Sequence, residues 1–255
     1  MLSRPPKVRW RLLAAALSSL FLGACGVEAR HDPFTASGEL IALSGGDGGV
    51  RNACFTCHGV RGQGDHASVP RLAGLPAGHL QKQLEDYAAG RRDDPVMGPV
   101  AWALTTDDRR AVAAYYGGLP ASVGEVGARG GSTAAAARLY HLGDLARGIA
   151  PCATCHGAVG EGVGAANPPV ARQPQAYLAD QLARWRAGRR RNDPRGVMMQ
   201  ISQRLTASEI AALAAYAATL SGLPVPAELS PEASRSARRG DAARGAERSP
   251  PHAVE

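Results

Sequence analysis

The 255-residue sequence predicts an all-α protein made of two tandem copies of one small helical domain. Three observations support this prediction: an internal repeat, apolar residues at helical spacing, and a short cysteine and histidine motif that occurs twice. No stretch alternates apolar and polar residues for long enough to predict a strand. The length allows one large domain or two small ones, and it excludes a large enzyme fold with several inserted modules.

Residues 1–24 have the residue order of an export signal. Basic residues precede an apolar run from Leu12 to Leu22, which is followed by small residues and is shorter than the roughly 20 residues that span a bilayer. The end of this run, Leu22-Gly-Ala-Cys25, resembles a bacterial lipoprotein cleavage box. We therefore expect Cys25 to be lipidated and to hold the chain on the periplasmic side of a membrane. In the alternative, cleavage follows Ala29 and Cys25 is discarded.

The charge of the exported part is small and unevenly distributed. Removal of the signal lowers the formal net charge from +7 to +3, so there is no general electrostatic reason to expect nucleic acid as a partner. The net charge is −1 from Arg30 to Gly118 and +5 from Gly130 to Leu223. The two halves of the chain therefore carry opposite charge balances.

The internal repeat extends well beyond the cysteine motif. Residues 54–59 recur as residues 152–157, an offset of 98 positions. After a three-residue insertion the offset becomes 101, which aligns Met97 with Met198. One small domain has been duplicated.

Each copy shows helical signals at matching positions. Thr105 with Asp108, and Thr206 with Glu209, predict capping boxes that open the last helix of each copy. We expect each copy to contain three or four helices around long loops. Two sets of apolar residues fall on one helical face, and they are Leu80, Leu84 and Tyr87 in the first copy and Leu178, Leu182 and Trp185 in the second.

Composition divides the chain into segments. Gly117 to Thr133 is rich in Gly, Ser and Ala, and the chain beyond Pro224 has no periodicity, so these parts predict a linker and a disordered tail. The predicted organisation is an export signal (1–24), a tether (25–38), a first domain (39–119), a linker (120–132), a second domain (133–223) and the tail (224–255).

The duplicated motif matches the attachment signature of haem c, Cys-x-x-Cys-His. In that chemistry two thiols bind the vinyl groups of one porphyrin, and the next residue places an imidazole on the iron. The sequence therefore predicts two covalently bound haem c groups, with His58 and His156 as proximal ligands. The four attachment residues are Cys54, Cys57, Cys152 and Cys155. With only 5% aromatic residues to fill two cores, a bound porphyrin would also supply apolar volume.

Other interpretations of the cysteines explain less. A zinc site would need its cysteine pairs about 15–20 residues apart, whereas 95 positions separate Cys57 from Cys152. A thioredoxin-like redox pair would need a strand-helix-strand context. A disulfide within each pair would leave the histidine unexplained twice.

Methionine is the expected sixth ligand of each iron. Met97 and Met198 occupy matching places in the two copies. Met199 is the rival in the second copy, but its counterpart is Gly98, so we prefer Met198. Isolated methionines are usually core fillers, and duplication is what favours ligation here.

The remaining histidines have no histidine counterpart in the other copy. We therefore interpret His66, His79 and His141 as ordinary surface or loop residues. Pro70 and Pro168 could each offer a carbonyl oxygen to the Nδ1 proton of the proximal histidine and so fix its orientation. A simple role in turning the loop is the alternative for both prolines.

From Gly38 to Leu223 the chain resembles a dihaem cytochrome of the cytochrome c4 family, which contains two tandem class I cytochrome c domains. The resemblance includes both haem motifs, the Gly-x-Gly that follows each motif, the Pro-x-Leu-Ala stretch from Pro70 to Ala73, and the Ala-Ala-Tyr endings. It implies one-electron transfer in a respiratory chain, with a membrane quinol-oxidising complex or a dehydrogenase as donor and a terminal oxidase as acceptor. The lipoprotein box at Cys25 and the polar tail depart from the family pattern.

Three functions remain open on the sequence. An iron with His and Met on its two axial sides has no open position for a substrate, which favours an electron carrier over an enzyme. A haem subunit of a periplasmic dehydrogenase would differ from a free carrier only in its partner. A dihaem peroxidase, or a sulfur-compound dehydrogenase, would need one iron to lose its sixth ligand or to gain a cysteine ligand. Four of the five cysteines are assigned to haem and one to the lipoprotein box.

A run of arginines lies close in sequence to Met198. We expect either a solvated basic loop or a patch that steers the second domain onto an acidic partner. Its members are Arg184, Arg186, Arg189, Arg190, Arg191 and Arg195.

Overall fold

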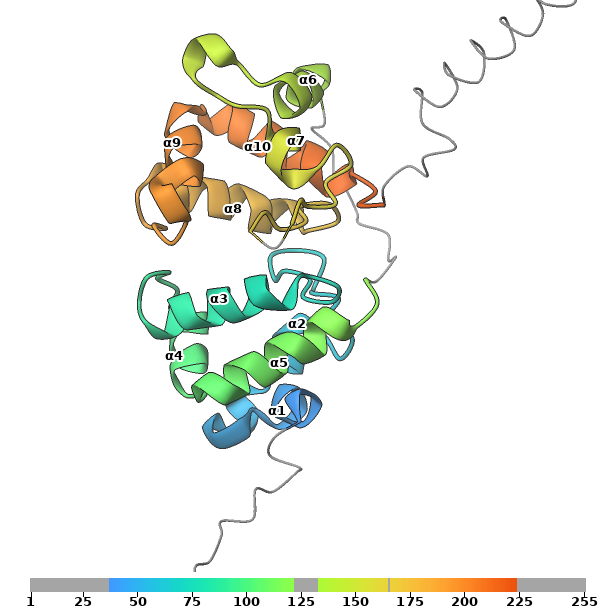
Figure 1. The fold of residues 1–255 in the computed structure, drawn as a ribbon, viewed down its shortest axis with the longest axis vertical. Coiled ribbons are helices and arrows are strands. Elements are labelled where there is room, and N and C mark those ends of the chain that lie inside the picture. The colour runs from blue at the N-terminus through green and yellow to red at the C-terminus, as the bar shows by residue number, and fades with distance from the viewer. Residues whose placement is uncertain (1–36, 122–132, 165, 224–255) are drawn as a thin grey trace, which may run out of the picture.

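The computed structural model describes residues 37–121, 133–164 and 166–223. The predicted export signal, Cys25, most of the tether and linker, and the tail lie outside the described residues. In the described part every regular element is a helix, and pairing between extended residues is limited to isolated bridges. The predicted all-α class is confirmed. The two helical domains lie one above the other in Figure 1.

The two domains have the same order of helices. In the described ranges each domain contains five α-helices instead of the predicted three or four, because the helices of the haem motifs, four and five residues long, are too short to show periodicity. The first domain contains α1 (Gly38–Ser44), α2 (Phe55–His58), α3 (Ala77–Ala88), α4 (Met97–Trp102) and α5 (Thr106–Gly118). The second contains α6 (Ala134–Leu142), α7 (Cys152–His156), α8 (Gln175–Arg186), α9 (Val197–Arg204) and α10 (Ala207–Thr219).

Both predicted capping boxes are confirmed at the start of α5 and α10. The Thr105 hydroxyl accepts from the Asp108 N–H at 3.1 Å, and the Asp108 carboxylate accepts from the Thr105 N–H at 3.0 Å. The matching distances between Thr206 and Glu209 are 3.2 Å and 2.8 Å. The boxes satisfy backbone donors that a helix start leaves free, and they fix where the last helix of each domain begins.

The last helix of each domain organises the core. Helix α5 packs against α1 and α3, and α10 packs against α6 and α8. The cores differ in which helix contributes the large ring. In the first domain Tyr116 of α5 faces a core with Ala42 on α1, whereas in the second Tyr140 comes from α6 and Ala217 from α10. Both tyrosines are 2% exposed. The large ring therefore fills the core of each domain, although it comes from a different helix in each.

Helices α3 and α8 face each other across the domain boundary (Figure 1). This boundary is polar: Gln83 of α3 and Gln181 of α8 are buried there, and side chains from each domain donate hydrogen bonds to the other. In the described part of the chain, no helix combines the length and apolar character needed to cross a bilayer.

Candidate haem-binding sites

Each cysteine motif presents one thiol toward the core and one toward solvent. Cys54 and Cys152 pack against the apolar cores of their domains, and burial raises the pKa of each thiol to about 11. Cys57 and Cys155, three positions later, are exposed. All four are free thiols, so neither pair forms a disulfide. This arrangement leaves both thiols of each pair available to a single flat group that lies between core and solvent.

The two histidines that follow the cysteines are held by matching hydrogen bonds. Nδ1 of His58 lies 2.9 Å from the Pro70 carbonyl oxygen, and Nδ1 of His156 lies 2.8 Å from the Pro168 carbonyl oxygen. A carbonyl only accepts, so Nδ1 carries the proton and the lone pair of Nε2 is left free for a metal. Burial lowers the pKa of both imidazoles, which also favours their neutral form.

The Gly-x-Gly segments allow the chain to fold back closely after each histidine. Gly62 has a φ of +64°, and a Cβ there would lie 2.7 Å from the ring of Tyr116. Both the backbone conformation and the close contact require glycine. From this turn, the N–H of Gly64 donates to the His58 carbonyl oxygen at 2.8 Å. The loop therefore stays against the histidine and brings Pro70 under it.

The two predicted methionine ligands lie at the start of matching helices. Met97 is the first residue of α4, and its N–H donates to the Asp94 carboxylate at 2.9 Å. Met198 lies in the first turn of α9, and its N–H donates to the Asp193 carboxylate at 2.7 Å. Both side chains are partly buried.

Packing of these helices bears on the choice between Met198 and Met199. Ala101 and Ser202 are both 0% exposed, and each lies one helical turn after Met97 and Met198 respectively. Residues four apart share a helical face, so Met97 and Met198 occupy equivalent faces. The methyl group of Met199 lies beside Gly196, in the turn that precedes α9.

The donor groups fit haem c better than they fit a bare metal ion. Each domain offers paired thiols, a neutral imidazole with a free Nε2, and a partly buried thioether. Within the residues that the structure describes, no three His, Cys, Asp or Glu side chains form a group that could bind a metal ion directly. Among the described residues, the buried indole N–H of Trp185 in the second domain has no acceptor. A bound group could supply the acceptor that this N–H lacks.

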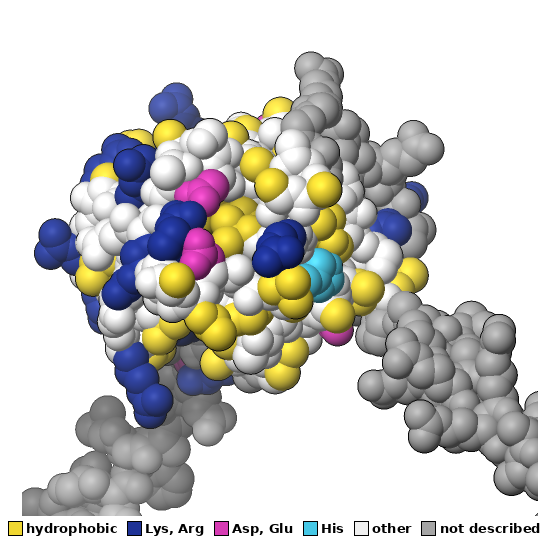
Figure 2. All heavy atoms as spheres, turned by 90° about the horizontal axis from the view of Figure 1, so that it is seen from above, with side chains coloured by type: hydrophobic (Ala, Val, Ile, Leu, Met, Phe, Trp, Pro, Cys, Tyr) yellow, Lys and Arg dark blue, Asp and Glu magenta, His cyan; other side chains and the backbone are white. Residues whose placement is uncertain are grey.

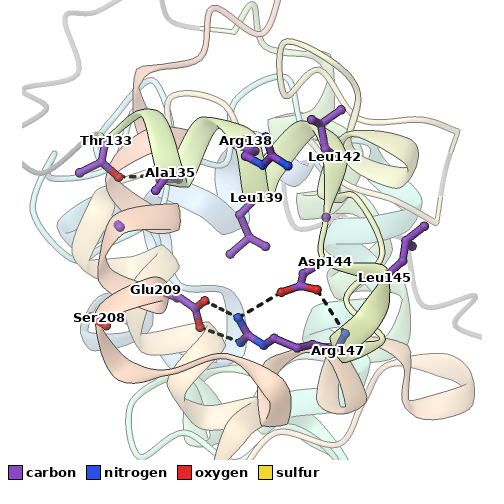
Figure 3. A pocket seen from close by; sticks show the side chains of 13 residues that line it. Thr133, Ala135, Arg138, Leu139, Leu142, Asp144, Leu145, Arg147, Ser208 and Glu209 are labelled. Atoms are coloured by element: carbon purple, nitrogen blue, oxygen red, sulfur yellow. Dashed lines mark hydrogen bonds and ion pairs between the residues drawn. The ribbon is translucent and has the colours of Figure 1, made fainter.

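A cavity of about 660 Å³ lies away from both motifs. It is a surface groove between α6, the short turn Leu145–Arg147 and α10 (Figure 3). Arg147 crosses it and donates to both carboxylate oxygens of Glu209, at 2.6 Å and 2.9 Å. No haem-motif residue lines it, so this groove does not contain the predicted chemistry.

One histidine prediction is wrong. His79 is not a surface or loop residue: it lies within α3, is partly buried, and faces the domain boundary. Burial, with the charges of Arg190 and Arg92, lowers its pKa to about 3. His66 is an exposed loop residue as predicted. His141 is exposed on α6, and its Nε2 lies 2.8 Å from the Tyr216 hydroxyl.

The predicted arginine patch is also smaller than its sequence indicates. Arg190 is only 6% exposed and belongs to the domain boundary, so it cannot contact a partner. Arg184 pairs with Asp180 and donates to the Asp93 carbonyl oxygen of the first domain. Arg186, Arg189, Arg191 and Arg195 remain exposed. Seen from its second-domain end, the molecule shows more basic than acidic side chains (Figure 2).

Comparisons with known proteins agree with this geometry. The family model for cytochrome c matches residues 48–119 and 147–221. The chain is 41% identical to a thiosulfate dehydrogenase electron acceptor of Stutzerimonas stutzeri, over 72% of this chain and 87% of the relative. A solved thiosulfate dehydrogenase of Marichromatium purpuratum is 44% identical with a TM-score of 0.66, and the match covers 74% of this chain but 40% of that longer chain. Cytochrome c4 of Pseudomonas stutzeri is 31% identical with a TM-score of 0.58, and the match covers 67% of this chain and 93% of that one.

Proposed function

This chain belongs to the cytochrome c family, as a dihaem cytochrome of the cytochrome c4 type, and we propose that it accepts electrons from a thiosulfate dehydrogenase. It binds two haem c groups covalently and carries electrons. The observation that carries the proposal is the similarity to a thiosulfate dehydrogenase electron acceptor of Stutzerimonas stutzeri, which covers 87% of that relative's length. The onward acceptor would be a terminal oxidase or another later member of a respiratory chain.

The axial ligand pairs in this proposal are His58 with Met97 and His156 with Met198. Bound haem would supply an iron that changes between its ferric and ferrous states. The protein residues would close both axial positions, and the Pro70 and Pro168 carbonyls would orient the histidines through Nδ1. With both positions closed, the chain would pass electrons without binding a small substrate at the iron.

A dedicated haem subunit of a dehydrogenase is the second candidate. The match to 40% of a solved thiosulfate dehydrogenase chain favours it, because part of that longer chain resembles 74% of this one. In that case the present chain would form a stable complex with its donor. An enzyme in its own right has less support, since every cysteine of the described residues belongs to a haem motif.

Electron transfer from the donor can be tested directly. The mature protein should carry a mass increment of two haems that survives acid-acetone extraction. Thiosulfate alone should leave its oxidised form unchanged, and thiosulfate with catalytic amounts of a thiosulfate dehydrogenase should reduce both haems. Reduction by thiosulfate without the dehydrogenase would replace the carrier assignment with an enzyme. Co-elution of donor and protein on gel filtration would identify a subunit.

We place the protein in the periplasm, held to a membrane through lipid on Cys25. The proposal rests on the sequence alone, because Cys25 lies outside the described residues. Labelled fatty acid should enter the wild type but not Cys25→Ser, which should move to the soluble fraction. Each buried methylene of an acyl chain contributes about 0.8 kcal/mol, so several chains would hold the protein firmly. Wild-type protein found only in the soluble periplasm would show that Cys25 is discarded.

A further inference from the structure

An exposed apolar patch lies beside Met97 in the first domain. Trp102, the last residue of α4, is 78% exposed, and Val96, just before that helix, is 61% exposed. Pro95 and Pro99 are exposed as well. We call Pro95, Val96, Pro99 and Trp102 the tryptophan patch. Large apolar side chains that stay exposed next to one another mark an interaction site, whereas single ones need no explanation.

The tryptophan patch faces away from the haem site. Ala101, one helical turn after Met97, is 0% exposed, so the face of α4 that these two residues share packs inward. Pro99 and Trp102 lie about 200° and about 140° from Met97 around the helix axis. A haem bound on the Met97 face would therefore leave the patch uncovered. A protein seated on the patch would be separated from that haem by the thickness of one helix, about 10 Å.

The patch borders a hollow in the surface of the first domain. This cavity of about 550 Å³ lies between the end of α3 and α4, and its lining includes Tyr87 of α3 and three members of the patch (Figure 1). The Asp94 carboxylate accepts from the N–H groups of Val96 and Met97, at 3.0 Å and 2.9 Å, and so fixes the loop where α4 begins. Two members of the patch are prolines, whose rings fix φ. The surface is therefore pre-formed, which lowers the entropy cost of seating a partner.

The exposed charge at the hollow is negative. Asp93 and Asp94 both line it, and Asp94 lies 3.6 Å from Arg184 in an ion pair. Asp93 is exposed and forms no ion pair with any described residue. Arg92 also lines the hollow, but it is 4% exposed and its guanidinium donates to side chains of the domain boundary. A partner that complements this surface has an apolar contact region with basic residues around it.

The matching helix of the second domain presents a different surface. With the offset of 101 positions, the four patch residues correspond to Gly196, Val197, Gln200 and Gln203. Two amides and a glycine thus replace the tryptophan and both prolines, and Gln203 is exposed like Trp102. The net charge of −1 over residues 30–118, against +5 over residues 130–223, follows the same division. The apolar, acidic surface is therefore a property of the first domain and not of the shared fold.

We propose that the electron donor docks on the tryptophan patch, through an apolar surface surrounded by basic residues. The proposal rests on the proposed function, in which this donor is a thiosulfate dehydrogenase. Thiosulfate is a divalent anion, so an enzyme that binds it needs a positive potential around its active site. Electrons leave the donor from that site, and the surface next to it therefore complements the acidic first domain. One electron at a time passes from the reduced donor to the ferric iron of the first domain, and Trp102 acts only through contact.

The test is steady-state reduction of the ferric holoprotein by thiosulfate with catalytic amounts of a thiosulfate dehydrogenase. Trp102→Gln introduces the residue of the second domain at an exposed position, so the fold and both haem potentials should persist. We expect the KM for the holoprotein to rise about tenfold, the scale of an interface tryptophan, while kcat changes much less. Trp102→Phe keeps an aromatic ring and should recover most of the affinity. Gln203→Ala is the matched control and should change neither constant.

Binding without turnover tests the same contact. The Kd of the ferric holoprotein for the immobilised dehydrogenase, measured by biolayer interferometry, should rise in Trp102→Gln by the same factor as KM. Asp93→Asn should slow association at low salt and flatten its dependence on ionic strength, with little change in dissociation. Unchanged KM and Kd in Trp102→Gln, with the wild type still reduced, would overturn the docking proposal alone. A wild type that the dehydrogenase does not reduce would overturn the proposed function, and this proposal with it.

Two other occupants of the patch give different results. If a second copy of the chain covers it, sedimentation velocity would show a wild-type dimer that Trp102→Gln abolishes, with KM unchanged. If the onward acceptor docks there, Trp102→Gln would slow oxidation of the reduced protein by oxidase-containing membranes but not its reduction by the dehydrogenase. Either result would overturn the assignment of the patch to the donor.

Discussion

The two domains share their haem-binding residues but differ in charge. The formal net charge is −1 over residues 30–118 and +5 over residues 130–223. The histidine hydrogen bonds and capping boxes nevertheless match within a few tenths of an ångström. Duplication has therefore kept the hydrogen bonds of the residues proposed to position the haem and has allowed the surface to diverge. We expect the two domains to contact different partners.

The surroundings of the two histidines that we propose as proximal ligands also differ. His58 is 6% exposed, whereas His156 is only partly buried. Beside His58 the side chain of Gln63 covers Gly59, and at the matching place Glu161 covers Gly157. An amide in one domain thus stands where a carboxylate stands in the other. The same local fold can hold its two haems at different potentials.

The largest expected effect concerns the axial methionines. Met97→His or Met198→His should lower the potential of one haem by tenths of a volt, within the range of about 0.8 V that axial ligands span. Each variant should also remove its share of the methionine-to-iron band in the oxidised spectrum. Spectroelectrochemistry would show whether the change stays within one domain. A wild type without the band would contradict the assignment of both ligands.

Met199→Leu is the control for the second domain. It should leave the band and both potentials unchanged, because Met199 lies beside Gly196 and not on the face shared by Met198 and Ser202. Loss of the band in this variant would move the ligand from Met198 to Met199.

The second effect separates the two buried tyrosines. The Tyr140 hydroxyl donates to the Gly157 carbonyl oxygen at 2.8 Å, next to the proximal histidine, whereas the buried Tyr116 hydroxyl has no acceptor among the described residues. Tyr140→Phe should lower the free energy of unfolding by about 1–2 kcal/mol, and Tyr116→Phe should be close to neutral. Urea unfolding with hydrogen exchange would assign each loss to a domain. Equal losses in both variants would show that the two rings play the same role.

The sequence was sufficient for the features that depend on local patterns. The haem motifs, both capping boxes and the repeat are readable because a few neighbouring residues determine each of them. The short helices α2 and α7 were missed, since four or five residues carry no period. The loop that follows each histidine bonds to the end of its helix, through the N–H of Gly64 to His58 and of Gly162 to His156, both at 2.8 Å.

Contacts between domains could not be predicted in the same way. Arg190 lies in a run of arginines that resembles a solvated loop, and His79 has no histidine counterpart. Both are placed by the packing of one domain on the other, which brings together residues about 100 positions apart. The matching positions of Arg92 and Arg190, and of Gln83 and Gln181, were the available signal. They were visible in the repeat, but nothing local showed that they would face each other.

A smaller effect is expected from the pH dependence of the second domain. Hydrogen bonds from Arg147, and then from Thr206, lower the pKa of Glu209 from 4.5 to about 2. A carboxylate with a lowered pKa in the folded state stabilises the fold above pH 4.5, and this contribution is lost as the pH falls through 2. Solvent screening limits it to about 1 kcal/mol. In the first domain the position that matches Arg147 is Gly49, so Asp108 at the matching capping box has no equivalent arginine.

Acid unfolding of the holoprotein tests this difference. Glu209→Gln should destabilise the protein at neutral pH and should flatten the loss of stability between pH 4.5 and 2. Asp108→Asn, at the matching capping box, should change the slope less because it lacks the arginine. A larger change of slope in Asp108→Asn would show that the capping box, and not Arg147, causes the pH dependence.

The smallest effect should come from exchanging the groups beside the two proximal histidines. The Glu161 carboxylate would stabilise the more positive ferric state of a haem bound in the second domain, so Glu161→Gln should raise the potential of that haem. Gln63→Glu should lower the potential of the first haem for the same reason. Both side chains are only half-buried, so each change should amount to at most about 1 kcal/mol.

The double exchange gives the sharpest form of this comparison. With Gln63→Glu and Glu161→Gln together, the difference between the two haem potentials should change by the sum of the single shifts, because the two sites belong to different domains. Gln63 accepts a hydrogen bond from the Arg61 N–H at 3.0 Å, and Glu161 accepts one from the Val159 N–H at 3.0 Å. Either an amide oxygen or a carboxylate oxygen can accept these bonds. The fold should therefore tolerate the exchange. Potentials that move together in each single variant would instead mean that long-range coupling through the domain boundary outweighs the charge next to each histidine.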